Sequence, residues 1–413
     1  MVLREVLAVA VLILFPGTAM TASSGAPASL DHLPPMVFYV AKGAPDACGP
    51  GCDSWIALEG MVDAGAADRF RKFLRRQQDR RLPMYFSSPG GNLDQALAMG
   101  RMLREKPTIA RVARTVVKEC GSEPQTGEAC LVLKRSGRVL EAELAEQGAM
   151  CNSACPYLIL GAAAREIAPN TVLAVHSPKV ILSIRGKPSE KQRAEAVQRG
   201  MERANRIVAV YLARMGIDRG LLDLAKTVKF ESPHVLARDE IFRFGIDRRE
   251  FVETPWQFEN AGRAFVSKIA IARTSDGATF RTTQLRLFCD GKDRARLMLV
   301  REFDKSAIGT SSVALIANSE KPLTFAVLPR VGGFEIRSAA IASDELKNFF
   351  AAPHLQVGEI TPLPDGKSTQ AIFEIETRGL EGAWTQLSAT CAAPPSSAGR
   401  SIDVPGMAKA PAL

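Results

Sequence analysis

The chain has 413 residues, of which 46% are hydrophobic and 23% charged. It therefore has enough apolar material for globular cores and is too long for one typical compact domain. The formal charge is +9, from 53 Lys and Arg against 44 Asp and Glu. Basic clusters such as residues 69–81 alternate with apolar residues at helical spacing, and no nucleic-acid-binding motif accompanies them. We expect solvated helix faces there and no nucleic-acid partner.

The N-terminus indicates export. A short head that carries Arg4 precedes an apolar stretch over residues 6–15, and Pro16 and small residues follow. A stretch of about ten apolar residues is too short to span a bilayer and has the proportions of a signal peptide. We predict a signal peptide over residues 1–22 and a flexible lead-in over residues 23–34. No later apolar run is long enough to cross a membrane, so we expect a periplasmic or extracellular protein without a transmembrane segment.

Eight cysteines form an even set, which in an exported chain indicates disulfides. Eight cysteines allow roughly a hundred pairings, so connectivity rests on position in the chain alone. Zinc is the alternative for closely spaced cysteines, but no histidine lies at ligand spacing, and we expect no metal or cofactor. Position suggests the pairs Cys48 with Cys52, Cys120 with Cys130, Cys151 with Cys155, and Cys289 with Cys391.

Strand and helix patterns alternate in the first half of the chain. Strands are expected over residues 36–41, 54–62, 82–88, 108–117 and 171–177, and helices over residues 66–80, 92–105 and 188–215 and from near Ser153. Such alternation predicts βα units around a mostly parallel sheet. We assign these units to a domain over residues 35–252.

The pattern changes near Pro255. Short runs of β-forming residues follow one another, separated by Gly, Asp, Ser and Pro. That spacing predicts a small all-β, sandwich-like domain over residues 258–394. A flexible tail is expected over residues 395–413.

A Pro-Gly-Gly turn follows the apolar strand of residues 82–88. Paired glycines between a strand and a helix let the backbone adopt positive φ and expose amide N–H groups, which suits an oxyanion or another negative group. The same dipeptides are also ordinary turn signals, so an unspecialised loop is the alternative.

Ser153 and His176 are candidates for nucleophile and general base. Ser153 lies between two cysteines at the start of an expected helix, where a serine is commonly an N-cap. A nucleophile favours the same place, because free amides and the helix dipole stabilise negative charge there. His176 ends an apolar strand, where a satisfied core histidine is the alternative to a base within reach of the serine.

The Pro-Gly-Gly turn, Ser153 and His176 occur in an order that is typical of one protein family. Ser-Pro-Gly-Gly at residues 88–91, the segment around Ser153, and the His-x-Pro at the end of the following strand resemble the proteolytic subunit family of the Clp protease, which belongs to the crotonase-like fold. The resemblance covers about residues 53–250. It implies a ClpP/crotonase-like α/β domain that acts as a serine protease.

Carried over to this chain, the resemblance implies that Ser153 is the nucleophile and His176 the general base. The backbone N–H groups of Gly91 and Ala154 would form the oxyanion hole. A gap-free match puts Pro233 where the family has its catalytic aspartate, so the neighbouring acids are the remaining candidates. These are Glu231 and Asp239. A lysine base, as in signal-peptide-peptidase relatives, would have to come from Lys179 or Lys187.

We therefore expect an exported serine hydrolase, peptidase-like, that forms an acyl-enzyme with peptide or protein substrates. The alternative is a catalytically degenerate ClpP-like scaffold that binds peptides or envelope partners. An acyl-CoA enzyme of crotonase type is disfavoured, because coenzyme A is a cytoplasmic cofactor. Analogy with the family also predicts a homo-oligomer.

Overall fold

The computed structural model describes residues 33–77, 81–106, 108–180, 188–260, 262–274, 277, 279–291, 294–302, 311–317, 321–363, 365–366 and 368–391. The predicted signal peptide, nearly all of the lead-in, the predicted tail and Lys187 lie outside these residues. None of the helices in the described ranges is long and apolar enough to cross a bilayer.

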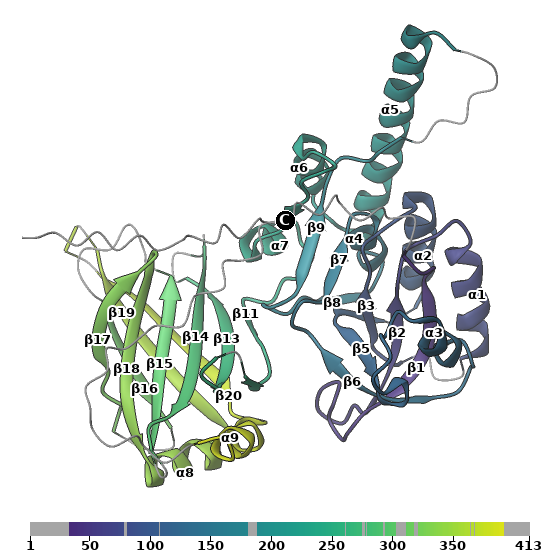
Figure 1. The fold of residues 1–413 in the computed structure, drawn as a ribbon. Helices are drawn as coiled ribbons and strands as arrows, with labels where there is room; N and C mark the ends of the chain where they lie inside the picture. The colour runs from purple at the N-terminus through teal and green to yellow at the C-terminus, as the bar shows by residue number, and fades with distance from the viewer. Residues whose placement is uncertain are drawn as a thin grey trace, which may run out of the picture. The chain divides into compact units, whose positions relative to one another are not determined.

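A seven-stranded sheet organises the first half of the described chain (Figure 1). Its order is β5-β6-β1-β2-β3-β4-β8, and β2, β3, β4 and β8 are mutually parallel. The strands are β1 (Val37–Lys42), β2 (Ser54–Glu59), β3 (Met84–Ser87), β4 (Ile109–Val112), β5 (Arg114–Val117), β6 (Leu140–Ala145) and β8 (Ala164–Glu166).

Two helices cover one face of this sheet. They are α1 (Ala66–Arg76) and α2 (Leu93–Arg104), each of which follows a strand. Phe70 of α1 and Leu97 of α2 are fully buried against Ile56 and Phe86 of the sheet. The apolar residues of both helices recur at helical spacing, so burial of one helix stripe on one face of the sheet fixes this layer.

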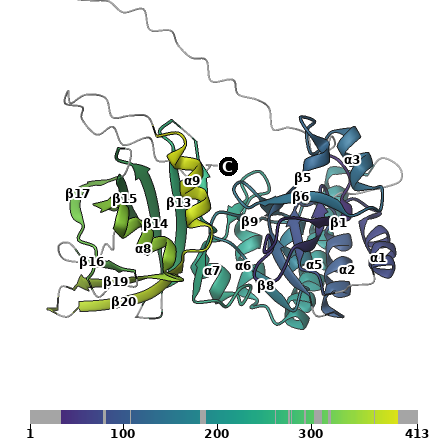
Figure 2. The same ribbon diagram turned by 90° about the horizontal axis from the view of Figure 1, so that it is seen from below.

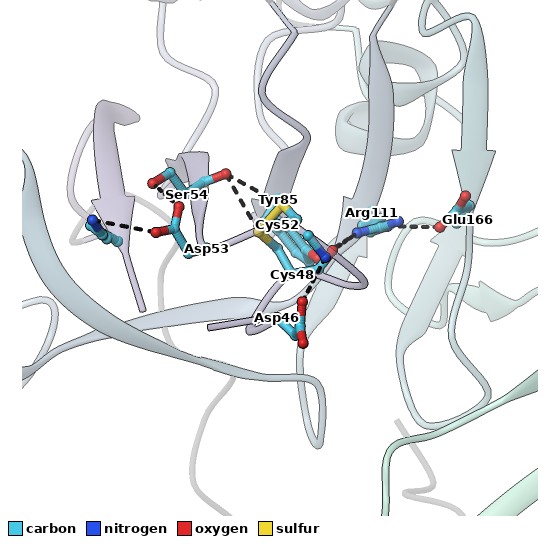
Figure 3. Close-up of a disulfide and its surroundings, with 10 residues drawn as sticks. Asp46, Cys48, Cys52, Asp53, Ser54, Tyr85, Arg111 and Glu166 are labelled. Carbon is cyan, nitrogen blue, oxygen red and sulfur yellow. Dashed lines mark hydrogen bonds and ion pairs between the residues drawn. A yellow bond between two sulfur atoms is a disulfide. The ribbon is translucent and has the colours of Figure 1, made fainter. Parts of the chain in front are cut away.

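The opposite face holds a second apolar cluster around Trp55, Tyr85 and the helix α3 (Glu128–Lys134). A short 3-10 helix, η2 (Lys118–Cys120), precedes α3, and the Cys120–Cys130 disulfide joins the two. The Cys48–Cys52 disulfide closes the turn between β1 and β2 (Figure 3). Arg111 donates to the Cys48 carbonyl and pairs with Glu166 at 2.7 Å, which ties this turn to β8.

A three-stranded sheet of order β10-β9-β7 carries the predicted serine and histidine. Its strands are β7 (Met150–Asn152), β9 (Val172–Val175) and β10 (His234–Val235), with β7 parallel to β9. The helix α4 (Ala154–Ile159) starts directly after β7 and packs with α2. Three further helices follow β9, namely α5 (Glu190–Met215), α6 (Gly220–Thr227) and α7 (Arg238–Arg243). The first half of α5 extends away from the other elements of this region (Figure 1).

From residue 251 onward the described chain is dominated by antiparallel strands. One sheet has the order β11-β13-β14-β15-β18-β17, with β12 paired to β13, and the other β16-β19-β20. The strands are β11 (Phe251–Glu253), β12 (Gln257–Glu259), β13 (Phe265–Arg273), β14 (Phe280–Cys289), β15 (Arg294–Glu302), β16 (Ser312–Ile316), β17 (Ala326–Val331), β18 (Phe334–Ala342), β19 (His354–Pro362) and β20 (Ser368–Glu376).

Two helices accompany these strands, α8 (Ser343–Ala351) and α9 (Leu380–Ser388). Figure 2 shows α9 alongside β13, and its buried Leu380, Ala383 and Leu387 belong to the same apolar cluster as Val266 of that strand. The Cys289–Cys391 disulfide fixes the end of β14 to the residues just after α9.

The structure confirms a mixed α/β protein and disulfide bonding. The eight cysteines form four disulfides in the pairs that their positions suggested. The expectation of an all-β second region is wrong, because α8 and α9 cover part of its strands. The strand expected over residues 108–117 is broken at Ala113, where pairing with β3 ends and pairing with β6 begins. The domain boundary near residues 252–258 stays a prediction.

Candidate functional site

The turn at residues 88–91 is locked between two strands. Ser88 is fully buried, donates its N–H to Met150 O at 2.8 Å, and accepts the Asn152 N–H at 3.0 Å. Its hydroxyl accepts the Gly90 N–H at 3.1 Å, which closes the turn on itself. The end of β3 is thus held against β7, the strand that leads into Ser153.

Both glycines of this turn need the absence of a side chain. Gly90 has a φ of 103° and Gly91 a φ of 134°, values that L side chains rarely adopt. A Cβ on Gly90 would lie 2.5 Å from Ser153 Cβ and 2.9 Å from Ala154 N. The backbone of Gly90 therefore packs closely against Ser153 and the backbone N–H of Ala154.

Ser153 has an unusual backbone conformation. Among the described non-glycine residues only Asp46 and Ser153 have a positive φ, and Ser153 combines a φ of 60° with a ψ of −107°. Strain of this kind is concentrated at functional sites, where the surrounding structure holds it in place. Ser153 occupies the N-cap position of α4, but its side chain makes no capping hydrogen bond. The capping role expected from the sequence is therefore wrong, and the hydroxyl is left for another use.

Two backbone N–H groups beside Ser153 have no acceptor in the described part of the chain: those of Gly91 and Ala154. Val62 donates its N–H to Gly90 O and accepts the Asn92 N–H, both at 2.7 Å. Because successive backbone N–H groups of an extended segment point to opposite sides, the N–H of Gly91 points away from Val62. Ala154 is the first residue of α4, where an N–H has no intrahelical partner. These are the two amides that the family resemblance implies for an oxyanion hole.

His176 comes to the same edge through strand pairing. Ser153 donates its N–H to Ala174 O at 2.9 Å, and His176 follows Ala174 by two residues, just beyond the end of β9. Ser153 directly follows β7 and His176 directly follows β9, and the carboxyl ends of neighbouring parallel strands share one edge of a sheet. The two residues therefore lie at the same edge of this sheet.

The imidazole of His176 is 9% exposed and is held by two contacts. Its Nδ1 lies 2.8 Å from Ser177 O, and its ring packs edge-on against Phe230 with the ring centroids 4.7 Å apart. A carbonyl can only accept, so Nδ1 carries the proton in the neutral ring, and Nε2 has a free lone pair. This tautomer is the one that a general base requires. Neither contact is marked by a local sequence pattern.

Glu231, Asp239 and Lys179 make no hydrogen bond to this imidazole within the described residues. Glu231 and Asp239 are exposed and make no hydrogen bond to His176. Lys179 is exposed, and its ammonium lies over the Phe230 ring at 5.2 Å from the centroid. The carbonyl of Ser177 thus occupies the orienting position that a carboxylate has in a Ser-His-Asp triad.

The Cys151–Cys155 disulfide spans the serine, and both cysteines are fully buried. Cys151 lies in β7 and Cys155 in the first turn of α4, so the bond fixes the two elements whose junction holds Ser153 in its strained conformation. We expect Cys151→Ala with Cys155→Ala to lower fluorophosphonate labelling of Ser153 at least about tenfold, because the backbone can then relax. Labelling rate and thermal unfolding would be measured side by side.

The Cys48–Cys52 disulfide offers a matched control. It also has a sequence separation of 4, and it lies before β2, at the opposite strand ends from Ser88 and Ser153. A disulfide that closes a loop of this size stabilises a fold by about 2 kcal/mol in the chain-entropy model. Both double variants should therefore lose a similar free energy of unfolding. Equal labelling by the two variants would show that the Cys151–Cys155 bond does not position the serine.

No protein-family model and no curated protein matches the chain. Among solved structures, the chain is similar to a mutant of 1510-N, a membrane-bound stomatin-specific protease, at 14% sequence identity and a TM-score of 0.27. The match covers 45% of this chain and 73% of that one. A similarity of this strength carries no conclusion about fold or activity.

Proposed function

We propose that this protein is an exported serine hydrolase, peptidase-like, built on a ClpP/crotonase-like domain over residues 35–252. Ser153 is the nucleophile, His176 the general base, and the N–H groups of Gly91 and Ala154 form the oxyanion hole. The four disulfides indicate an oxidising compartment, which supports the periplasm or the extracellular space.

In this mechanism the Ser153 Oγ attacks the carbonyl carbon of the substrate, and its proton passes to His176 Nε2. The carbonyl oxygen becomes an oxyanion that accepts from the two amides. Collapse of the tetrahedral intermediate breaks the scissile bond, and the leaving group takes the proton from His176. Water then repeats the sequence on the acyl-enzyme and releases Ser153. The Ser177 carbonyl accepts from the Nδ1–H of His176 in both the neutral and the protonated ring, which keeps Nε2 for the proton transfers.

One observation carries the proposal. Ser153 has a positive φ, its hydroxyl makes no capping hydrogen bond, and the nearby N–H groups of Gly91 and Ala154 have no acceptor among the described residues. A helix cap or a loop serine has no need of that conformation. The alternative, a ClpP-like scaffold that only binds peptides or envelope partners, rests on Pro233 in the place of the family's acid.

Fluorophosphonate labelling of the oxidised protein, followed by peptide mapping, separates the two functions. We expect one adduct, on Ser153, that is absent in Ser153→Ala. His176→Ala should lower the labelling rate about 10²–10⁴-fold, the usual contribution of a positioned base. Ser177→Ala keeps the orienting carbonyl and should label like the natural protein. A folded protein that does not label would contradict the hydrolase proposal and favour the binding scaffold.

A further inference from the structure

A cluster of arginines lies apart from Ser153, around the end of α2, the strand β8 and the segment after α7. Arg165 of β8 is half-buried, and its N–H groups donate to backbone carbonyls, two of which belong to Gly245 and Ile246 at 3.1 Å and 2.6 Å. Burial, and then the nearby charges of Arg104 and Arg248, lower the pKa of Arg165. The guanidinium groups of Arg104 and Arg248 are thus each close enough to Arg165 to disfavour its charge.

These charges are only partly balanced, because the Asp247 carboxylate acts on Arg165 without forming an ion pair with it. Neither Arg104, Arg165 nor Arg248 has an acidic partner at ion-pair distance within the described residues. Asp247 is close to Arg165, but its oxygens are bound to Arg238 and Arg249 at 3.0 Å and 2.6 Å. Like charges gathered without a counter-ion cost free energy, and an anion bound between them would remove that cost.

An open cavity of about 310 Å³ adjoins this cluster. It lies between the end of α5 and the end of α7, and Arg243 and Arg248 line it together with Asp218 and the backbone of residues 244–245. Gly245 has a φ of 72°, and a Cβ there would lie 3.2 Å from Nη2 of Arg248. The glycine therefore lets the Arg248 guanidinium lie against the backbone at the cavity wall.

Arg243 is available to a ligand as well. Its side chain is 64% exposed, and its acidic neighbour Glu240 is 3.9 Å away, at the limit of an ion pair. Two exposed guanidinium groups in one cavity offer paired N–H donors, the geometry that favours phosphate and carboxylate oxygens. Asp218 is the acidic residue in the cavity lining, and the two arginines outweigh its charge, so the lining is net positive.

We propose that this cavity binds a phosphate group through Arg243 and Arg248, with Arg104 and Arg165 adding to its positive field. A free phosphate and the headgroup of an anionic phospholipid present the same chemistry. The site is separate from Ser153, so it stands or falls independently of the proposed hydrolase activity.

The test uses the purified full chain and two double variants of equal net charge. Arg243→Gln with Arg248→Gln removes the cavity donors, and Arg199→Gln with Arg203→Gln removes two exposed charges from the first half of α5. Inorganic phosphate is titrated by calorimetry at constant ionic strength. Vesicles of phosphatidylcholine, with and without phosphatidylglycerol, are tested by co-sedimentation.

We expect at least tenfold weaker binding in the cavity variant and a change of less than twofold in the α5 variant. Loss of inorganic phosphate binding would identify a free phosphate as a sufficient ligand. Loss of vesicle binding alone, with phosphatidylglycerol present, would identify a lipid headgroup. Binding of neither probe by the natural chain, or equal weakening in both variants, would overturn the proposal.

Discussion

Gly90→Ala is expected to lower fluorophosphonate labelling of Ser153 at least about 100-fold, the scale of a lost oxyanion-hole donor. The added methyl group would lie 2.5 Å from Ser153 Cβ and 2.6 Å from Asn152 O, distances that no relaxed structure tolerates. Ser88 is tied to β7, and Gly90 and Asn92 are tied to Val62, by backbone hydrogen bonds, so the turn cannot move alone. The methyl group would therefore push Ser153 and Ala154 away from the backbone of Gly90 and Gly91.

Gly148→Ala is the matched control for this variant. Gly148 also has a positive φ, 70°, but a Cβ there would meet nothing within 4 Å. Both substitutions carry the cost of a side chain at positive φ, about 1–2 kcal/mol, and only Gly90→Ala adds the clash with Ser153. Labelling is compared on protein that near-UV circular dichroism shows to be folded. Similar labelling by the two variants would mean that the glycine turn does not shape the site.

The segments of the candidate site could be singled out from the sequence because each is marked by local chemistry. Paired glycines after an apolar strand, a serine at a helix start, and a histidine at a strand end are visible without a fold. The positive φ of Ser153 is not, because it depends on β7, α4 and the turn at residues 88–91 holding one another. The contacts of His176 with Phe230 and the Ser177 carbonyl are likewise set by long-range packing and by backbone direction.

In the region after residue 251, the prediction of secondary structure from the sequence fails for a different reason. The spacing of Leu380, Ala383 and Leu387 in α9 is helical and was available in the sequence, but it stands among many β-forming runs that dominate the pattern. The break at Ala113 has no local signal at all. Its residues remain β-forming on both sides, and only the change of partner from β3 to β6 creates two strands.

Asp247→Asn is expected to destabilise the protein by about 3–5 kcal/mol at pH 7, the usual cost of breaking a buried ion pair. The Asp247 side chain is 1% exposed, and that of Arg238 is 6% exposed. Asp247 also accepts the Ile167 N–H at 2.9 Å, between β8 and β9. The amide would leave the Arg238 charge buried without a counter-charge. Asp223→Asn, at an exposed carboxylate, should change the free energy of unfolding little.

The same carboxylate gives the effect its pH dependence. Burial by itself would raise the pKa of Asp247, but hydrogen bonds from Arg249 and Arg238 outweigh it and lower the pKa from 3.8 to about 2. A depressed folded-state pKa stabilises the protein above the unfolded value, and that contribution, about 2 kcal/mol, is lost as the pH falls from about 5 to below 2. The stability gap between the natural chain and Asp247→Asn should therefore narrow over that range in urea unfolding. A gap of constant size would show that Asp247 is not the charged partner of Arg238, and that the link from α7 to the segment between β8 and β9 depends on packing instead.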